Sequence, residues 1–253
     1  MRAVSFLRVN DMIYVVSGNV GEGKSYHVLS AVAVPHLLRG GVVATNMNID
    51  LDRISKNFKR RLAPWQLIRI DAASDPRKIP HGDFRGEGRR KVVVILDEAL
   101  NWFASSSGPK DERKGTWGEW LRQSDKLGQD VYFIAQAFDR AAKWIRELAQ
   151  VAIRIANFKN ITFLRLPIGK WFHLDSLYGA STYDVRSQIL LSWWCHQIKP
   201  QFYQCYKTAE LFGFDAGASG YVATLPPAFR LPFFPFVLPL VLGVVGVVYA
   251  ALA

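Results

Sequence analysis

The feature that most constrains this chain is the octapeptide at residues 18–25, Gly-Asn-Val-Gly-Glu-Gly-Lys-Ser. It fits G-x-x-x-x-G-K-[ST] at every fixed position, after an apolar run at residues 12–17 and before a predicted helix at residues 25–39. The alternative is a glycine-rich turn that matches by chance. The strand before and the helix after are the context that a phosphate-binding loop requires, so we predict one here.

The residue types of the octapeptide follow from phosphate chemistry. Its glycines let backbone N–H groups turn inward around an anion, and the positive end of the following helix adds to the field. Lys24 is expected to reach the β- and γ-phosphates, and the Ser25 hydroxyl is expected to bind Mg²⁺. The residues predicted to bind the nucleotide are Gly18, Asn19, Val20, Gly21, Glu22, Gly23, Lys24, Ser25 and Tyr26.

A second acidic motif follows the apolar run at residues 92–96. Asp97 and Glu98 come directly after this predicted strand, at the edge of the sheet where ligands bind. Asp97 is predicted to hold the magnesium ion, and Glu98 to orient or deprotonate an attacking water molecule. The alternative is that both carboxylates cap the next helix.

Other candidate catalytic residues surround the predicted strand at residues 131–135. Gln136 ends that strand, where an amide could sense the γ-phosphate or the attacking water. Arg122, Arg140 and Arg146 are candidates for a finger that reaches a neighbouring subunit's nucleotide, and we favour Arg122 and Arg146. For Gln136 the alternative is a solvated strand end, and each of the arginines alone is more often a surface charge.

The order of apolar runs predicts an α/β fold with a mainly parallel central sheet. Short buried strands alternate with helices, and after residue 150 the runs become shorter and more aromatic, which is typical of added antiparallel edge strands. Core strands are expected at residues 12–17, 42–45, 92–96 and 131–135, helices at 25–39, 115–127 and 139–150, and edge strands at 151–158, 161–166, 171–174 and 202–206.

Charge and cysteine content narrow the partners and the compartment. The formal net charge of +11 favours nucleic acid or an anionic membrane surface as a partner, without choosing between them. The chain has 2 cysteines, too few for a disulfide framework, and their spacing matches no zinc pattern. A reducing compartment is therefore expected for the main domain.

The C-terminal residues 231–253 contain no charged side chain and are long enough to cross a bilayer as a helix. The alternative is a buried core helix, and three prolines interrupt the first third of the segment. Because the basic flank ends at Arg230, we expect the N-terminal domain to face the cytoplasm. The predicted organisation is a catalytic domain at residues 1–210, a linker at 211–230 and a single membrane segment at 231–253.

Several ordered segments resemble the zonula occludens toxin family, which includes the assembly proteins of filamentous bacteriophages. The resemblance covers roughly residues 10 to 210. It rests on the phosphate-binding loop with Tyr26 and on four later segments, at residues 40–46, 96–103, 128–136 and 145–148. The loop alone is generic, and the ordered later segments make the match specific.

The resemblance implies a P-loop NTPase of the RecA or FtsK–HerA type that acts as an inner-membrane ATPase with ATP and Mg²⁺. Its expected partners are single-stranded phage DNA with coat protein, other phage assembly proteins, and further copies of the chain in a ring. Relatives often continue into a periplasmic region after the membrane segment. Two alternatives stay open: a genome-packaging ATPase that moves DNA inward, and a membrane scaffold that binds nucleotide without hydrolysing it.

Overall fold

The computed structural model describes residues 13–71, 74–82, 91–98, 112–136, 138, 143–160 and 174–206, all within one compact unit of the chain, residues 1–222. The strands are β1 Ile13–Ser17, β2 Val42–Thr45, β3 Leu67–Arg69, β4 Val92–Leu96, β5 Gln129–Ala135, β6 Val151–Asn157, β7 Leu177–Asp184 and β8 Leu190–Gln197. The helices are α1 Lys24–His27, η1 Val28–Ala33, α2 Val34–Leu38, α3 Leu51–Phe58, α5 Glu112–Gln123, α6 Lys143–Leu148 and α8 Pro200–Tyr203. Short 3₁₀ turns are η2 Pro64–Gln66, η3 Pro76–Lys78, η4 Phe158–Asn160 and η5 Leu174–Ser176.

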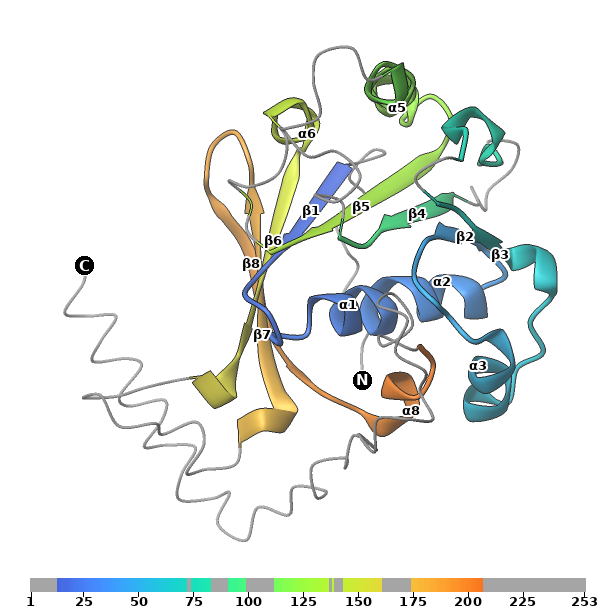
Figure 1. The fold of residues 1–253 in the computed structure, drawn as a ribbon. Helices are drawn as coiled ribbons and strands as arrows, with labels where there is room; N and C mark the ends of the chain where they lie inside the picture. The colour runs from blue at the N-terminus through green and yellow to red at the C-terminus, as the bar shows by residue number, and fades with distance from the viewer. Residues whose placement is uncertain are drawn as a thin grey trace, which may run out of the picture. The chain divides into compact units, whose positions relative to one another are not determined.

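A single eight-stranded sheet organises these elements, in the order β3-β2-β4-β5-β1-β6-β7-β8 (Figure 1). In the order of the sheet, the strands from β3 through β2, β4, β5 and β1 to β6 are parallel. Strands β7 and β8 continue the sheet in antiparallel pairing. This arrangement confirms the predicted mainly parallel sheet with antiparallel edge strands. Because β5 lies between β4 and β1, the carboxyl ends of all three strands meet at one edge of the sheet.

Two hydrophobic cores cover the two faces of the sheet. Helices α1, α2 and α3 lie on one face, while α5 and α6 lie on the other (Figure 1). The strand β4 shows why both layers are needed: all five of its residues are buried, with Val93 and Ile95 in one core and Val94 and Leu96 in the other. Strands covered on both faces read as continuous apolar runs, which is why the sequence pattern predicted β1, β2, β4 and β5.

The helix after β1 confirms the prediction for residues 25–39, but it is not a regular α-helix throughout. Its middle, η1, has π-helical geometry, and Pro35 lies at the start of the following α2. Proline has no backbone N–H, so the i→i−4 hydrogen bond at this position cannot form. The π-helical turns of η1 end two residues before this proline.

The antiparallel part of the sheet differs from the sequence prediction. Strand β6 matches the prediction for residues 151–158, but β7 and β8 were not predicted. The strand expected at residues 202–206 is wrong: residues 200–203 form helix α8, because Pro200 at its first turn suits a helix start. Residues 161–166 and 171–173 lie outside the described residues, and Leu174 lies in the turn η5 rather than in a strand.

Two further elements were not predicted. Helix α3 begins after Asp50, whose carboxylate accepts a hydrogen bond from Arg53 N at 3.0 Å, a typical N-cap arrangement. Strand β3 has only three residues and none is fully buried, so it gives little periodic signal. The predicted helices at residues 115–127 and 139–150 correspond to α5 and α6, which end earlier.

Within the described residues, we find no helix with the length and apolar character needed to span a bilayer. The predicted linker at residues 211–230 and the predicted membrane segment at residues 231–253 both lie outside those residues.

Candidate functional site

The loop after β1 adopts a conformation that depends on its glycines. A side-chain carbon at Gly18 would lie 2.5 Å from the Ile155 carbonyl oxygen on β6, so only glycine fits this close approach. Gly23, which precedes the first residue of α1, has a φ of 90°, in the left-handed region that favours glycine. The loop thus closes tightly over the sheet edge and delivers Lys24 and Ser25 to the start of the helix.

Side chains within the loop hold its shape. Lys24 Nζ donates hydrogen bonds to the carbonyl oxygens of Gly18 and Asn19, each at 2.8 Å. The buried Glu22 carboxylate accepts one hydrogen bond from Asn19 N at 2.6 Å and another from Asn19 Nδ2 at 3.0 Å. Burial lowers the pKa of Lys24. The nearby carboxylates raise it by a smaller amount, and Asp97 makes the largest of these contributions. Through its two hydrogen bonds with Asn19, the Glu22 side chain stabilises the conformation of the loop.

The structure brings the two predicted motifs into direct contact. Ser25 Oγ donates a hydrogen bond to Asp97 Oδ2 at 2.8 Å, which joins the start of α1 to the end of β4. Burial raises the pKa of Asp97, and the hydrogen bonds from Ser25 Oγ and Glu98 N lower it by a smaller amount. A hydroxyl and a carboxylate from residues 72 positions apart in the sequence thus converge on one point.

Glu98 and Gln136 lie at the same edge of the sheet. Glu98 follows Asp97 with a φ of 53°, in the left-handed region that a non-glycine residue rarely adopts. Gln136 comes directly after Ala135, which is in register with Ser17, the residue before Gly18. It is exposed to solvent. Their placement beside the loop agrees with the predicted edge, and their catalytic roles remain predictions.

One residue at the site was missed by the sequence analysis as a functional candidate. Asn46, directly after β2, donates a hydrogen bond from Nδ2 to Asp97 O and accepts one at Oδ1 from Asp97 N, both at 2.8 Å. The available signal was an amide at the end of a predicted buried strand, the same kind of signal that selected Gln136.

Tyr26 has a buried side chain that is committed to other contacts. Its hydroxyl accepts a hydrogen bond from Lys199 N at 2.7 Å, and its ring packs nearly perpendicular to the Tyr178 ring. A contact from Tyr26 to a nucleotide would therefore come from its backbone N–H.

The predicted finger arginines lie on the helices of the opposite face. Arg122 is exposed near the end of α5, which leads into the start of β5, so it lies toward the edge of the sheet away from the loop. Arg146 is partly buried on α6. Their role at a neighbouring subunit's site remains a prediction, and Arg140 lies outside the described residues.

The donor set suits a magnesium ion shared with phosphate. Mg²⁺ binds oxygen ligands, and protein sites commonly supply one or two of them while phosphates and water supply the rest. Ser25 Oγ and Asp97 Oδ2 are two such oxygens, already within hydrogen-bonding distance of each other. In the part of the chain that the structure describes, no group of three or more His, Cys, Asp or Glu side chains could hold a metal ion.

Comparison with known proteins assigns the chain to a family. The family described as zonular occludens toxin (Zot) matches residues 12–207, which include every element of the site. The chain belongs to the Zot family. A solved structure similar to it is the N-terminal domain of zonular occludens toxin from Neisseria meningitidis, with 16% identity, a TM-score of 0.48, and coverage of 79% of this chain and 100% of that one.

Two curated relatives of this Zot-family chain come from bacteriophages. The Gene 1 protein of Enterobacteria phage I2-2 is 27% identical over 158 residues, and that of Salmonella phage IKe is 26% identical over 158 residues. Each match covers 62% of this chain and 42% of the relative, so the match spans less than half the length of these proteins.

Proposed function

We propose that this chain is a P-loop ATPase that drives assembly and extrusion of filamentous phage, a complex of single-stranded DNA and coat protein, across the inner membrane of the bacterial host. The observation that carries the hydrolase part is the 2.8 Å hydrogen bond between Ser25 Oγ and Asp97 Oδ2. It joins a phosphate-binding loop to an acidic strand end, the pairing that a magnesium-bound nucleotide needs. Membership of the Zot family and the phage Gene 1 relatives support the role in phage assembly.

Each residue of the site has a separate role in the proposed reaction. The loop N–H groups and Lys24 bind the phosphates of ATP, and for this Lys24 exchanges its contacts with Gly18 O and Asn19 O for phosphate oxygens. Ser25 and Asp97 hold Mg²⁺, which neutralises charge on the phosphates when it is bound. Glu98 orients the attacking water and accepts its proton, and Gln136 contacts the γ-phosphate or that water.

The cellular setting is part of the proposal. Residues 231–253 would anchor the protein as a single membrane segment, with the ATPase domain at residues 1–210 in the cytoplasm. We also propose a homo-oligomeric ring in which Arg122 or Arg146 completes the site of the next subunit. Other phage assembly proteins would be the remaining partners.

Phosphate release by the full chain in mild detergent tests the hydrolase. We expect Lys24→Ala to lose both ATP binding and turnover. Glu98→Gln should retain binding and lose turnover by about 100-fold or more, as expected for loss of a general base. Exposed residues of the same types, Lys56 and Glu119, supply the matched controls Lys56→Ala and Glu119→Gln.

The outcomes separate an enzyme from a scaffold. Equal phosphate release by wild type, Lys24→Ala and Glu98→Gln would refute hydrolysis at this site. ATP binding that depends on Lys24, without turnover in the wild type, would instead indicate a nucleotide-binding scaffold.

A further inference from the structure

The Asn46 side chain pairs with the backbone of a single residue across the sheet edge. Its amide donates to Asp97 O and accepts from Asp97 N, so both polar groups of the Asp97 backbone are bound by one planar amide. Two parallel hydrogen bonds fix an orientation as well as a distance, which one bond would not. Asn46 thereby joins the end of β2 to the end of β4.

The backbone held by Asn46 carries the acidic pair. Asp97 Oδ1 accepts from Glu98 N at 2.9 Å, while Oδ2 accepts from Ser25 Oγ. The left-handed conformation of Glu98 is unfavourable for a residue with a side chain, by about 1–2 kcal/mol. Such a conformation persists only where the surrounding contacts determine it, and Asn46 supplies two of them at the preceding residue.

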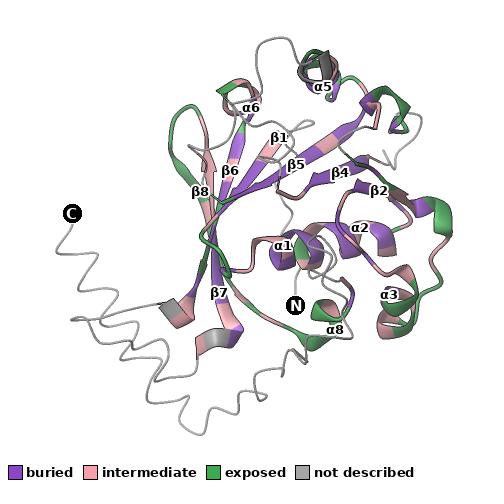
Figure 2. Cartoon of the chain, in the orientation of Figure 1, coloured by how far each residue is buried: buried purple, intermediate pink, exposed green. Residues whose placement is uncertain are grey.

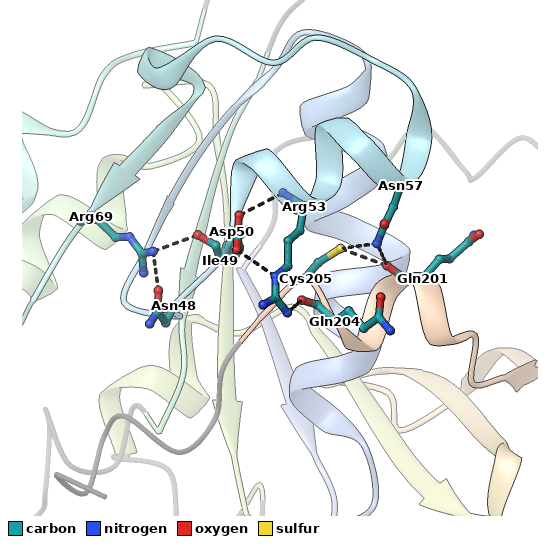
Figure 3. Close-up of polar contacts among 9 residues, drawn as sticks. All are labelled: Asn48, Ile49, Asp50, Arg53, Asn57, Arg69, Gln201, Gln204 and Cys205. Carbon is teal, nitrogen blue, oxygen red and sulfur yellow. Dashed lines mark hydrogen bonds and ion pairs between the residues drawn. The ribbon is translucent and has the colours of Figure 1, made fainter. Parts of the chain in front are cut away.

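The segment after Asn46 is itself held firmly from two directions. Arg69 at the end of β3 donates to Asn48 Oδ1 at 2.7 Å and to Ile49 O at 2.9 Å (Figure 3). On the other side, Ile49 forms a β-bridge with Tyr206, and Asp50 N donates to Cys205 O at 2.9 Å. Asn46 therefore projects from an anchored turn.

We propose that Asn46 is a positioning residue for the proposed ATPase reaction: its paired hydrogen bonds set the orientation of Asp97 and Glu98 toward the nucleotide. This inference rests on the proposed hydrolase function. Both hydrogen bonds of the Asn46 side chain go to Asp97 rather than to the loop at residues 18–25, so Asn46 acts on magnesium and water rather than on phosphate affinity.

The test compares Asn46→Ala and Asn46→Asp with the wild type. Alanine removes both hydrogen bonds, whereas aspartate keeps an acceptor for Asp97 N and loses the donor to Asp97 O. For both variants we expect kcat to fall by about 10- to 100-fold, the usual cost of removing a residue that orients a metal ligand. The Mg²⁺ concentration for half-maximal turnover should rise, while ATP affinity at saturating Mg²⁺ stays within about threefold.

Asn57→Ala is the matched control. Asn57 Nδ2 also donates to the backbone of a distant segment, Gln201 O at 2.8 Å, but it joins α3 to α8 rather than contacting Asp97 (Figure 3). We expect Asn57→Ala to lower the melting temperature and leave kcat and the Mg²⁺ dependence unchanged. This contrast separates a positioning role from a general loss of stability.

The possible results distinguish this inference from the proposed function. Wild-type turnover with an unchanged kcat in Asn46→Ala would overturn the inference and leave the hydrolase standing. Losses of kcat and ATP affinity in equal measure, matched by Asn57→Ala, would also overturn it. If the wild type shows no turnover, the hydrolase proposal fails. The positioning role of Asn46 is then tested by measuring how ATP binding depends on the Mg²⁺ concentration. A higher Mg²⁺ requirement in Asn46→Ala than in the wild type would support the role, and an equal requirement would refute it.

Discussion

The parallel strands and the β7–β8 hairpin belong to one sheet but meet solvent in different ways. All five residues of β4 are buried, whereas six of the eight residues of β8 are exposed (Figure 2). Both strands are rich in large apolar side chains, and β8 contains no Lys, Arg, Asp or Glu. Apolar content alone therefore does not bury a strand, because burial also requires that other elements cover both faces.

The two regions also contribute differently to the site. The loop, the acidic pair and Gln136 all follow parallel strands, whose carboxyl ends meet at one edge. The hairpin reaches the site indirectly: Tyr178 on β7 and His196 on β8 lie against His27, two residues after Ser25. The parallel part thus positions the candidate chemistry, while the hairpin supports the helix that carries part of it.

A pair of identical substitutions measures the difference between the regions and should give a large contrast in stability. Leu96→Ala in β4 removes a fully buried side chain, and we expect a loss of about 2–5 kcal/mol in the free energy of unfolding. Leu190→Ala in β8 removes a side chain that is 48% exposed, and we expect a loss below about 1 kcal/mol. Urea denaturation of both variants checks the contrast, and equal losses would contradict it.

The contact between the regions should respond to pH. Burial, with a contribution from His196, lowers the pKa of His27 to about 3. The unfolded chain therefore takes up a proton near pH 6.5 that the folded chain does not, and stability falls as pH decreases from 6.5 toward 3. The expected loss from His27 is about 1.4 kcal/mol per pH unit in that range.

His27→Asn tests this pH dependence, since asparagine can still face Tyr178 but does not titrate. Urea denaturation at about pH 7 and about pH 5.5, on either side of the ordinary histidine pKa, should show a smaller loss on acidification for the variant than for the wild type. The pKa of His196 is lowered by burial as well, so part of the pH dependence should remain. A pH dependence that is the same in His27→Asn and in the wild type would indicate that the folded protein does not lower the pKa of His27.

The smallest effect is expected at the hairpin surface. Trp193 is 54% exposed and stacks on Phe158 with ring centroids 6.5 Å apart. We expect Trp193→Ala to lower the free energy of unfolding by about 1 kcal/mol or less. Trp117→Ala on α5, where the side chain is 2% exposed, is the matched comparison with an expected loss of about 3–5 kcal/mol. A large effect at Trp193 would show that the exposed side chains of β8 contribute to stability as much as core side chains do.

Local patterns made much of the site predictable from the sequence. The phosphate-binding loop is contiguous, and Asp97 follows an apolar run that has the length and composition of a buried strand. Asn46 was missed because its role depends on the pairing of β2 with β4, which brings it beside a residue 51 positions later in the chain. No local pattern records that proximity.

The hairpin and α8 were poorly predicted for a different reason. Strand β8 exposes residues on both faces, so its sequence lacks the alternation of buried and exposed positions that identifies a strand. At residues 202–206 the aromatic side chains favoured a strand, but the proline at the first turn and contacts with α3 favour a helix. Strand β3 is too short for any periodicity to appear.

The attachment of residues 199–206 has a mechanical consequence. Lys199 is bound by the hydroxyl of Tyr26, and Tyr206 is bridged to Ile49. These attachment points lie one residue after Ser25 and three residues after Asn46. Tension on the chain beyond Tyr206 would therefore load the turn that carries Asn46 and the first turn of the phosphate-binding helix before it reached β8. A displacement of either element during a nucleotide cycle would, by the same connections, pull on the chain that continues toward the C-terminus.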